Sequence, residues 1–130
     1  MLATLDSTDA DTHFHLALIY ARRMLWDRAE EHFGKAVALK PDGFWIYQGF
    51  GHAKLAAGRL PEAEHLLKTA ASIKSFHSPT LVDLGRLYER RSEFAKAEEY
   101  FYEAIEADQN NAFAYHAYAK YLLQAGMKRD

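Results

Sequence analysis

The sequence has no cysteine, and only three of its 130 residues are proline. The absence of cysteine excludes a disulfide scaffold, a thiolate zinc site, a cysteine nucleophile and a dithiol redox centre. No apolar run approaches the roughly 18 residues that a membrane-spanning helix needs, and the first residues lack the basic and apolar regions of a signal peptide. We therefore expect no membrane partner and a cytoplasmic location.

A dominant charge is missing as well, because 16 Lys and Arg residues stand against 18 Asp and Glu residues. The net charge of -2 gives no overall attraction to nucleic acid or acidic lipid, so we expect no nucleic-acid partner. The remaining composition, 49% hydrophobic and 26% charged, is typical of a folded, helix-rich chain.

Signatures of catalysis and of cofactor binding are absent too. The sequence contains no Gly-rich phosphate loop and no nucleophile elbow. None of its seven histidines has another three or four residues away, the spacing that places two ligands on one helix face. We therefore expect neither an enzyme nor a site for a metal or cofactor.

What the sequence does contain is an internal repeat with a period of 34 residues. Residues 29–36, 63–70 and 97–104 each read alanine, three residues, a bulky apolar residue, two residues and alanine. The upstream halves keep the same offset, because Leu16-Ala17, Phe50-Gly51 and Leu84-Gly85 are also 34 residues apart. Apolar residues at these spacings form one stripe on each of two helices, so each period predicts a helical hairpin.

This period and pattern resemble the tetratricopeptide repeat (TPR) family. Counted from Ala10, Phe44 and Ser78, the signature positions of the family are 4, 7, 8, 11, 20, 24, 27 and 32. The three repeats match nearly all of them and depart only at His13, Lys54, Ser75 and Gln109. The resemblance implies an all-α fold, a right-handed superhelical solenoid of antiparallel helix pairs with about seven helices.

The predicted organisation follows from the repeat phase. A lead segment at 1–9 precedes repeats at 10–43, 44–77 and 78–111, and 112–130 forms the first helix of an incomplete fourth repeat or a capping helix. Helices are expected at about 10–23, 27–40, 44–57, 61–74, 78–91, 95–108 and 112–125. The small residues Ala17, Gly51 and Gly85 are expected to let each first helix approach Ala29, Ala63 and Ala97 of the second. Asp9, Gly43 and Ser78 are expected to cap the first helices, and Gly58 to end one.

In the TPR family the first helices line a concave surface that binds partners. The resemblance places these residues there: Phe14, His15, Leu18, Arg22, Trp45, Gln48, His52, Val82, Arg86, Arg90, Phe113, His116 and Lys120. Their apolar members are expected to be open to solvent, as in an interaction site. Two alternatives remain: Leu2 and Leu5, or a neighbouring subunit, cover Phe14 and Leu18, and Trp45 packs between repeats.

These residues predict a non-catalytic adaptor or scaffold that binds a protein or peptide with apolar or aromatic anchors and some acidic residues. The family's clamp for a chaperone C-terminal carboxylate is not expected, because its positions hold Phe14, Leu18, Gly49, Pro79 and Asp83. One alternative is a scaffold that assembles into homo-oligomers through its ends, with Tyr115, Tyr118 and Leu122 uncovered by a following helix. The other is that the chain belongs to a longer protein, as the docking arm of an enzyme.

Overall fold

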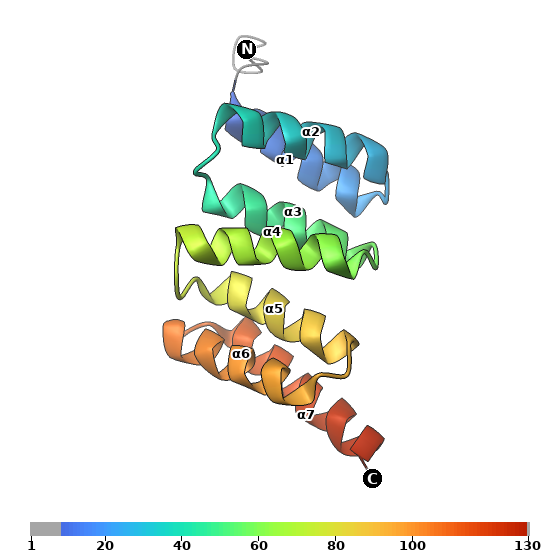
Figure 1. Cartoon of the computed structure of the whole chain (residues 1–130), viewed down its shortest axis with the longest axis vertical. Coiled ribbons are helices and arrows are strands. Elements are labelled where there is room, and N and C mark those ends of the chain that lie inside the picture. The colour runs from blue at the N-terminus through green and yellow to red at the C-terminus, as the bar shows by residue number, and fades with distance from the viewer. Residues whose placement is uncertain (1–8, 130) are drawn as a thin grey trace. The chain divides into compact units, whose positions relative to one another are not determined.

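The computed structural model describes the backbone of residues 9–129 and the side chains of residues 9–126. Over this part of the chain the structure is built from helices and contains no strand (Figure 1). The helices are α1 (Ala10–Arg22), α2 (Trp26–Leu39), α3 (Phe44–Ala56), α4 (Leu60–Ile73), α5 (Ser78–Arg90), α6 (Phe94–Ala107) and α7 (Ala112–Arg129). The expected helix bounds agree to within one residue, except that α7 continues past residue 125.

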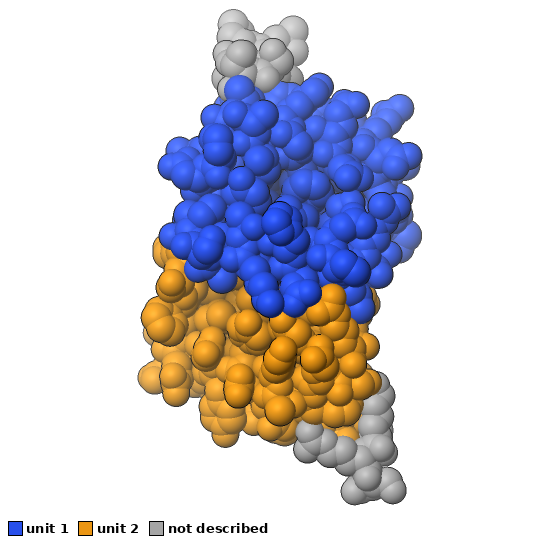
Figure 2. Space-filling view, in the orientation of Figure 1, with its two compact units in different colours: residues 1–73 blue, residues 74–130 orange. Residues whose placement is uncertain are grey.

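The chain divides into two compact units, residues 1–73 and residues 74–130 (Figure 2). In the first unit α1 packs along α2 and α3 packs along α4, while in the second α5 packs along α6 and α7 follows α6. These contacts confirm the all-α array of helix pairs. Apart from Asp9, the predicted lead segment lies outside the described residues, as do Leu2 and Leu5.

In each helix pair, a small residue of the first helix lies at the contact with the second helix. A methyl group added to Gly51 would lie 2.7 Å from Cγ of Leu67, and one added to Gly85 would lie 2.9 Å from the ring of Phe101. Both large residues are fully buried, as is Ala17 at the same position of α1. The expected close approach is therefore confirmed, but the atoms nearest the two glycines belong to the bulky residues of the second helix rather than to its alanines.

Lys54, one of the departures from the repeat signature, is a buried cation that joins the two repeats of the first unit. Its side chain is only 9% exposed, and its Nζ lies 3.2 Å from Oε1 of Glu30 on α2 and 2.7 Å from Oε2 of Glu62 on α4. The hydrogen bond from Lys54 lowers the pKa of the Glu62 carboxyl, so this group stays ionised near neutral pH. Phe50 stacks on Phe33 at 4.7 Å between ring centroids, which adds an apolar contact between α3 and α2.

The helix ends show which predicted caps were right. The Asp9 carboxylate accepts hydrogen bonds from the Asp11 amide and the Thr12 hydroxyl, each at 3.0 Å, as an N-cap does. Gly43 caps α3, as expected. The expectation for Ser78 was wrong: His77 is the N-cap residue of α5, and the buried Ser78 hydroxyl instead donates to the Ala104 carbonyl at 2.8 Å.

The turn between the two helices of each repeat contains one residue in the left-handed region. Met24, Gly58 and Ser92 occupy it with φ of 60°, 81° and 60°, and they are spaced by the repeat period. Only the second repeat uses glycine, which adopts this conformation without a steric penalty.

Two glycine-to-alanine changes should therefore shift stability in opposite directions. Gly34 lies inside α2 and Gly58 in the turn after α3, and an added methyl group would meet no atom within 4 Å at either site. We expect Gly34→Ala to raise the free energy of unfolding by about 0.5–1 kcal/mol and Gly58→Ala to lower it by about 1 kcal/mol. Urea denaturation of both variants measures this, and a gain in stability for Gly58→Ala would contradict the backbone assignment.

Candidate functional site

A cavity of about 310 Å³ lies between α1 and α3 of the first unit. Three of the predicted binding residues line it: Leu18 and Arg22 of α1 and His52 of α3. The remaining walls are formed by Ala21, Trp26, Gly49, Ala53 and Ala56. The site is thus a mostly apolar pocket with two side chains that can carry positive charge, of a volume typical of small binding pockets.

Phe14 and Leu18 are less open to solvent than the sequence predicts, because α3 lies against them. Both are half-buried, and a methyl group added to Gly49 would meet the Phe14 ring at 2.6 Å and Leu18 at 3.6 Å. Gly49 itself is buried. The close packing of α3 therefore covers part of the apolar pair Phe14 and Leu18.

The other predicted residues of the first unit lie outside the cavity. Trp45, at the start of α3, is half-buried, with the Lys40 ammonium 5.5 Å from its ring centroid and Phe44 edge-on to it. Gln48 is half-buried, and His15 is exposed with its Nδ1 2.7 Å from the Asp11 carbonyl. Trp45 is therefore a partly covered aromatic residue beside a cation.

In the second unit, one contact joins two predicted binding residues from different helices. The Arg86 guanidinium of α5 lies 4.8 Å from the ring centroid of Phe113 on α7. Phe113 is 47% exposed, so the pair presents an apolar ring and a cation together. The exposed predicted residues nearby in sequence are Arg90, His116 and Lys120.

The position of Val82 contradicts its prediction as a binding residue. It was expected to be open to solvent, but its side chain is fully buried, and the neighbouring Asp83 is only 2% exposed. On α5 the buried residues run almost without a break from Ser78 to Tyr88, so this helix is covered on more sides than α1. Val82 is therefore part of the core and cannot touch a partner without a rearrangement.

The residues predicted for self-association lie on one face of α7. Tyr115 and Leu122 are each 47% exposed, and Tyr118 is half-buried among Phe101, Tyr102 and Tyr121. Burial raises the pKa of the Tyr118 hydroxyl, and the hydrogen bond with Tyr102 raises it further, so this group is neutral near pH 7.

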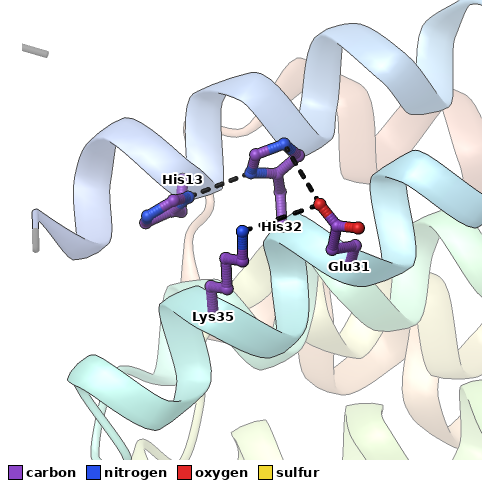
Figure 3. A network of polar contacts seen from close by, with 4 residues as sticks. All are labelled: His13, Glu31, His32 and Lys35. Atoms are coloured by element: carbon purple, nitrogen blue, oxygen red, sulfur yellow. Dashed lines mark hydrogen bonds and ion pairs between the residues drawn. The ribbon is translucent and has the colours of Figure 1, made fainter. Parts of the chain in front are cut away.

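Within the first repeat, a pair of histidines joins α1 to α2 (Figure 3). The Nδ1 atoms of His13 and His32 lie 2.9 Å apart, and the rings stack with centroids at 5.2 Å. Tyr20 stacks on the same His32 ring at 5.5 Å. Because one Nδ1 must donate the hydrogen bond and the other accept it, the contact requires at least one neutral ring.

The surroundings of His32 oppose a proton on its ring. Burial lowers the pKa of His32 below its ordinary value of 6.5, and the nearby His13 and Lys35 lower it further, while Glu31 acts in the opposite sense. Glu31 lies 4.0 Å from His32 Nε2 and 3.6 Å from Lys35 Nζ. The Arg28 guanidinium lies 5.8 Å from the ring centroid of Tyr20. The charged form of His32 is therefore disfavoured in the folded chain.

Sequence reasoning missed this pair because it compared only histidines on the same helix. His13 and His32 are 19 residues apart, on facing helices. The available signal was the position of His13, the one departure from the repeat signature in the first repeat. A histidine in place of an apolar residue at a buried position implies a polar partner on the opposite helix.

Two family models, both described as Tetratricopeptide repeat, match residues 25–84 and residues 78–111. Anaphase-promoting complex subunit 3 of Schizosaccharomyces pombe is 26% identical over 98 residues, which make up 75% of this chain and 15% of that protein. The chain spans 15% or less of the length of the curated relatives that it matches.

Solved structures share the fold at low identity. The translocator chaperone SycD of Yersinia enterocolitica matches with a TM-score of 0.82 and 17% identity, over 93% of this chain and 94% of that chain. The first TPR of Spaghetti (RPAP3), bound to the HSP90 peptide SRMEEVD, matches with a TM-score of 0.80 and 16% identity, over 93% and 96%. At these identities the likeness concerns the fold alone.

No helix among the described residues is both long and apolar enough to cross a membrane. No group of three or more His, Asp or Glu side chains in the described part of the chain is placed to hold a metal ion.

The histidine pair predicts a loss of stability in mild acid. Since the His32 pKa is lowered in the folded state, the unfolded chain takes up the proton more readily, and the free energy of unfolding should fall as the pH drops below about 6.5. His77, whose pKa burial also lowers, contributes in the same direction. Urea denaturation between pH 5 and pH 8 should show a shallower decline for His32→Gln than for the unmodified chain.

The matched control is His65→Gln, because His65 is exposed on α4. It should leave the pH dependence unchanged. If His32→Gln and His65→Gln gave the same pH profile as the unmodified chain, the pair would have no role in acid sensitivity.

Proposed function

Because the chain belongs to the tetratricopeptide repeat family, we propose that it is a non-catalytic adaptor or scaffold module that binds a peptide or a helix of a partner protein along its first helices. The observation that carries the proposal is the cavity between α1 and α3, which the predicted residues Leu18, Arg22 and His52 help to line. An extended surface of this kind is what stacked helical hairpins offer to partners.

The chemistry of the cavity supports a particular kind of peptide. Its walls are mostly apolar, so they favour an aromatic or large aliphatic side chain over a polar one. Arg22, the last residue of α1, lines the cavity and carries a permanent positive charge. This charge favours a carboxylate next to the apolar anchor of the peptide. The solved TPR neighbour bound to the peptide SRMEEVD is a case in which this fold holds an acidic peptide.

Cationic side chains of the second unit extend the preference for acidic residues in the peptide to that unit. Arg86 over Phe113 pairs a cation with an exposed ring, and Arg90 and Lys120 are exposed. The proposed binding residues are Phe14, His15, Leu18, Arg22, Trp45, Gln48, His52, Arg86, Arg90, Phe113, His116 and Lys120. Val82 is left out because it is buried.

The test is a selection of phage-displayed random peptides on the whole chain, followed by affinity measurement on the selected consensus peptide. We expect an aromatic or large aliphatic residue close to Asp or Glu in that consensus. Arg22→Ala and Trp45→Ala should each weaken binding by about tenfold or more, because both side chains belong to the proposed binding surface. The control Arg59→Ala removes the same charge from an exposed residue outside the cavity and should have little effect.

Two results would overturn the proposal. One is a consensus without acidic residues. The other is equal weakening by Arg22→Ala and Arg59→Ala, because a general charge effect and not the cavity would then govern affinity. The triple change Trp45→Ala, Arg86→Ala and Arg90→Ala extends the test to both units.

Self-assembly is the second candidate, and the exposure of Tyr115 and Leu122 favours it. Light scattering over a dilution series distinguishes it from partner binding. Self-assembly requires a molar mass that rises with concentration and is brought back to that of a monomer by Leu122→Glu. A constant monomer mass at high concentration would remove this candidate.

A further inference from the structure

The size of the cavity between α1 and α3 limits which side chain can fill it. Its volume is about 310 Å³. An apolar protein cavity of about 150 Å³ is filled by one benzene ring, so this cavity has about twice the volume that a single ring needs. A side chain with two fused rings matches this volume, whereas leucine or phenylalanine would leave part of it empty and lose contacts with the walls.

Four small residues create this volume. Gly49, Ala53 and Ala56 are spaced by four and three residues along α3, and Ala21 belongs to α1. Because residues at this spacing share one helix face, α3 presents a face without bulky side chains to the cavity. Gly49 and Ala53 are buried while Ala56 is exposed, so the cavity has a closed floor and an open rim.

The remaining walls favour an aromatic occupant. Trp26 at the start of α2 and Leu18 of α1 are half-buried and line the cavity, and two aromatic rings attract each other beyond the effect of buried area. The exposed Arg22 places a guanidinium at the rim, which suits the face of an indole ring and an adjacent carboxylate. Tryptophan is the natural side chain with two fused rings, so it fits the volume and the walls together.

This chain itself is a poor source of the occupant. The lead segment at 1–9 contains no aromatic residue and would leave much of the cavity empty. Of the two tryptophans in the sequence, Trp26 already forms a wall of the cavity. Trp45 of a second copy would bring Lys40, whose ammonium lies 5.5 Å from the Trp45 ring centroid, toward the cationic Arg22, and like charges oppose association. Volume and charge therefore favour a partner peptide.

We propose that the cavity selects a tryptophan side chain of an acidic partner peptide, and that Ala21, Gly49, Ala53 and Ala56 set this specificity by leaving space for the second ring. The inference rests on the proposed function. It goes further because the proposed function is met by any aromatic or large aliphatic anchor.

The probes are acetylated peptides of the sequence Ser-Xaa-Asp-Glu-Ser, in which Xaa is Trp, Phe or Leu, so that they differ only in the anchor. We expect the whole chain to bind the Trp peptide about fivefold or more tightly than the Phe and Leu peptides, because the second ring buries further apolar area. Isothermal titration calorimetry measures the affinities. Amide chemical-shift changes caused by the Trp peptide should map to α1, α3 and the start of α2.

The decisive variant is Ala56→Leu, which adds a larger side chain at the rim on an exposed helical position. It should weaken binding of the Trp peptide by about tenfold and that of the Phe peptide by less than about twofold, because the space for the second ring is lost. Adding Ala21→Leu should reverse the order of the two peptides. The matched control Ala38→Leu makes the same change on an exposed position of α2 outside the cavity and should alter neither affinity.

Circular dichroism melts establish that each variant is folded, and Ala56→Leu alone decides the test if the double variant is not. The inference is overturned if the three peptides bind equally or not at all, if Ala56→Leu weakens the Trp and Phe peptides equally, or if the shifts map elsewhere. It is also overturned if light scattering shows that the chain self-associates through Trp45, since a second copy would then be the occupant. Equal binding of the three peptides with continued dependence on Arg22 leaves the proposed function intact, whereas a selected consensus without acidic residues overturns the proposed function whichever anchor is preferred.

Discussion

The distance between the two helices of each pair is the constraint on which the rest of the structure depends. At Gly51 and Gly85 the second helix comes so close that a single added methyl group would overlap Leu67 or Phe101. At these two positions the bulky residue is fully buried and no side chain lies opposite it, and its burial supplies much of the apolar stabilisation of the pair. The positions of the other faces of the first helix follow from this contact, including those that line the cavity.

The helices and their pairing could be predicted from the sequence because they depend on local spacing. A 34-residue period fixes which residues share a stripe, and two stripes per period imply a hairpin. The candidate binding surface was less predictable, because the exposure of a residue depends on which neighbouring helix covers it. Val82 was expected in solvent from its position in the repeat, yet its side chain is fully buried. Phe14 was expected to be open, yet Gly49 lets α3 approach its ring.

The histidine pair shows a different limit of sequence reasoning. His13 and His32 meet because α1 and α2 face each other, so their separation in sequence gives no direct sign of contact. The departure of His13 from the repeat pattern was visible in the sequence, but its partner could be chosen only once the two helices had been placed together. The same holds for Lys54, whose two carboxylate partners lie on helices before and after its own.

The contacts of Lys54 also restrict how this array can change during evolution. The second repeat carries a buried ammonium group that draws one of its two carboxylates from the repeat before it. All three repeats have a glutamate at the position of Glu30, the other two being Glu64 and Glu98, so a copy of the second repeat could follow any of them and keep both counter-charges. The order of the repeats is therefore free, but this glutamate is not, because its loss from the preceding repeat would leave a buried cation with a single counter-charge.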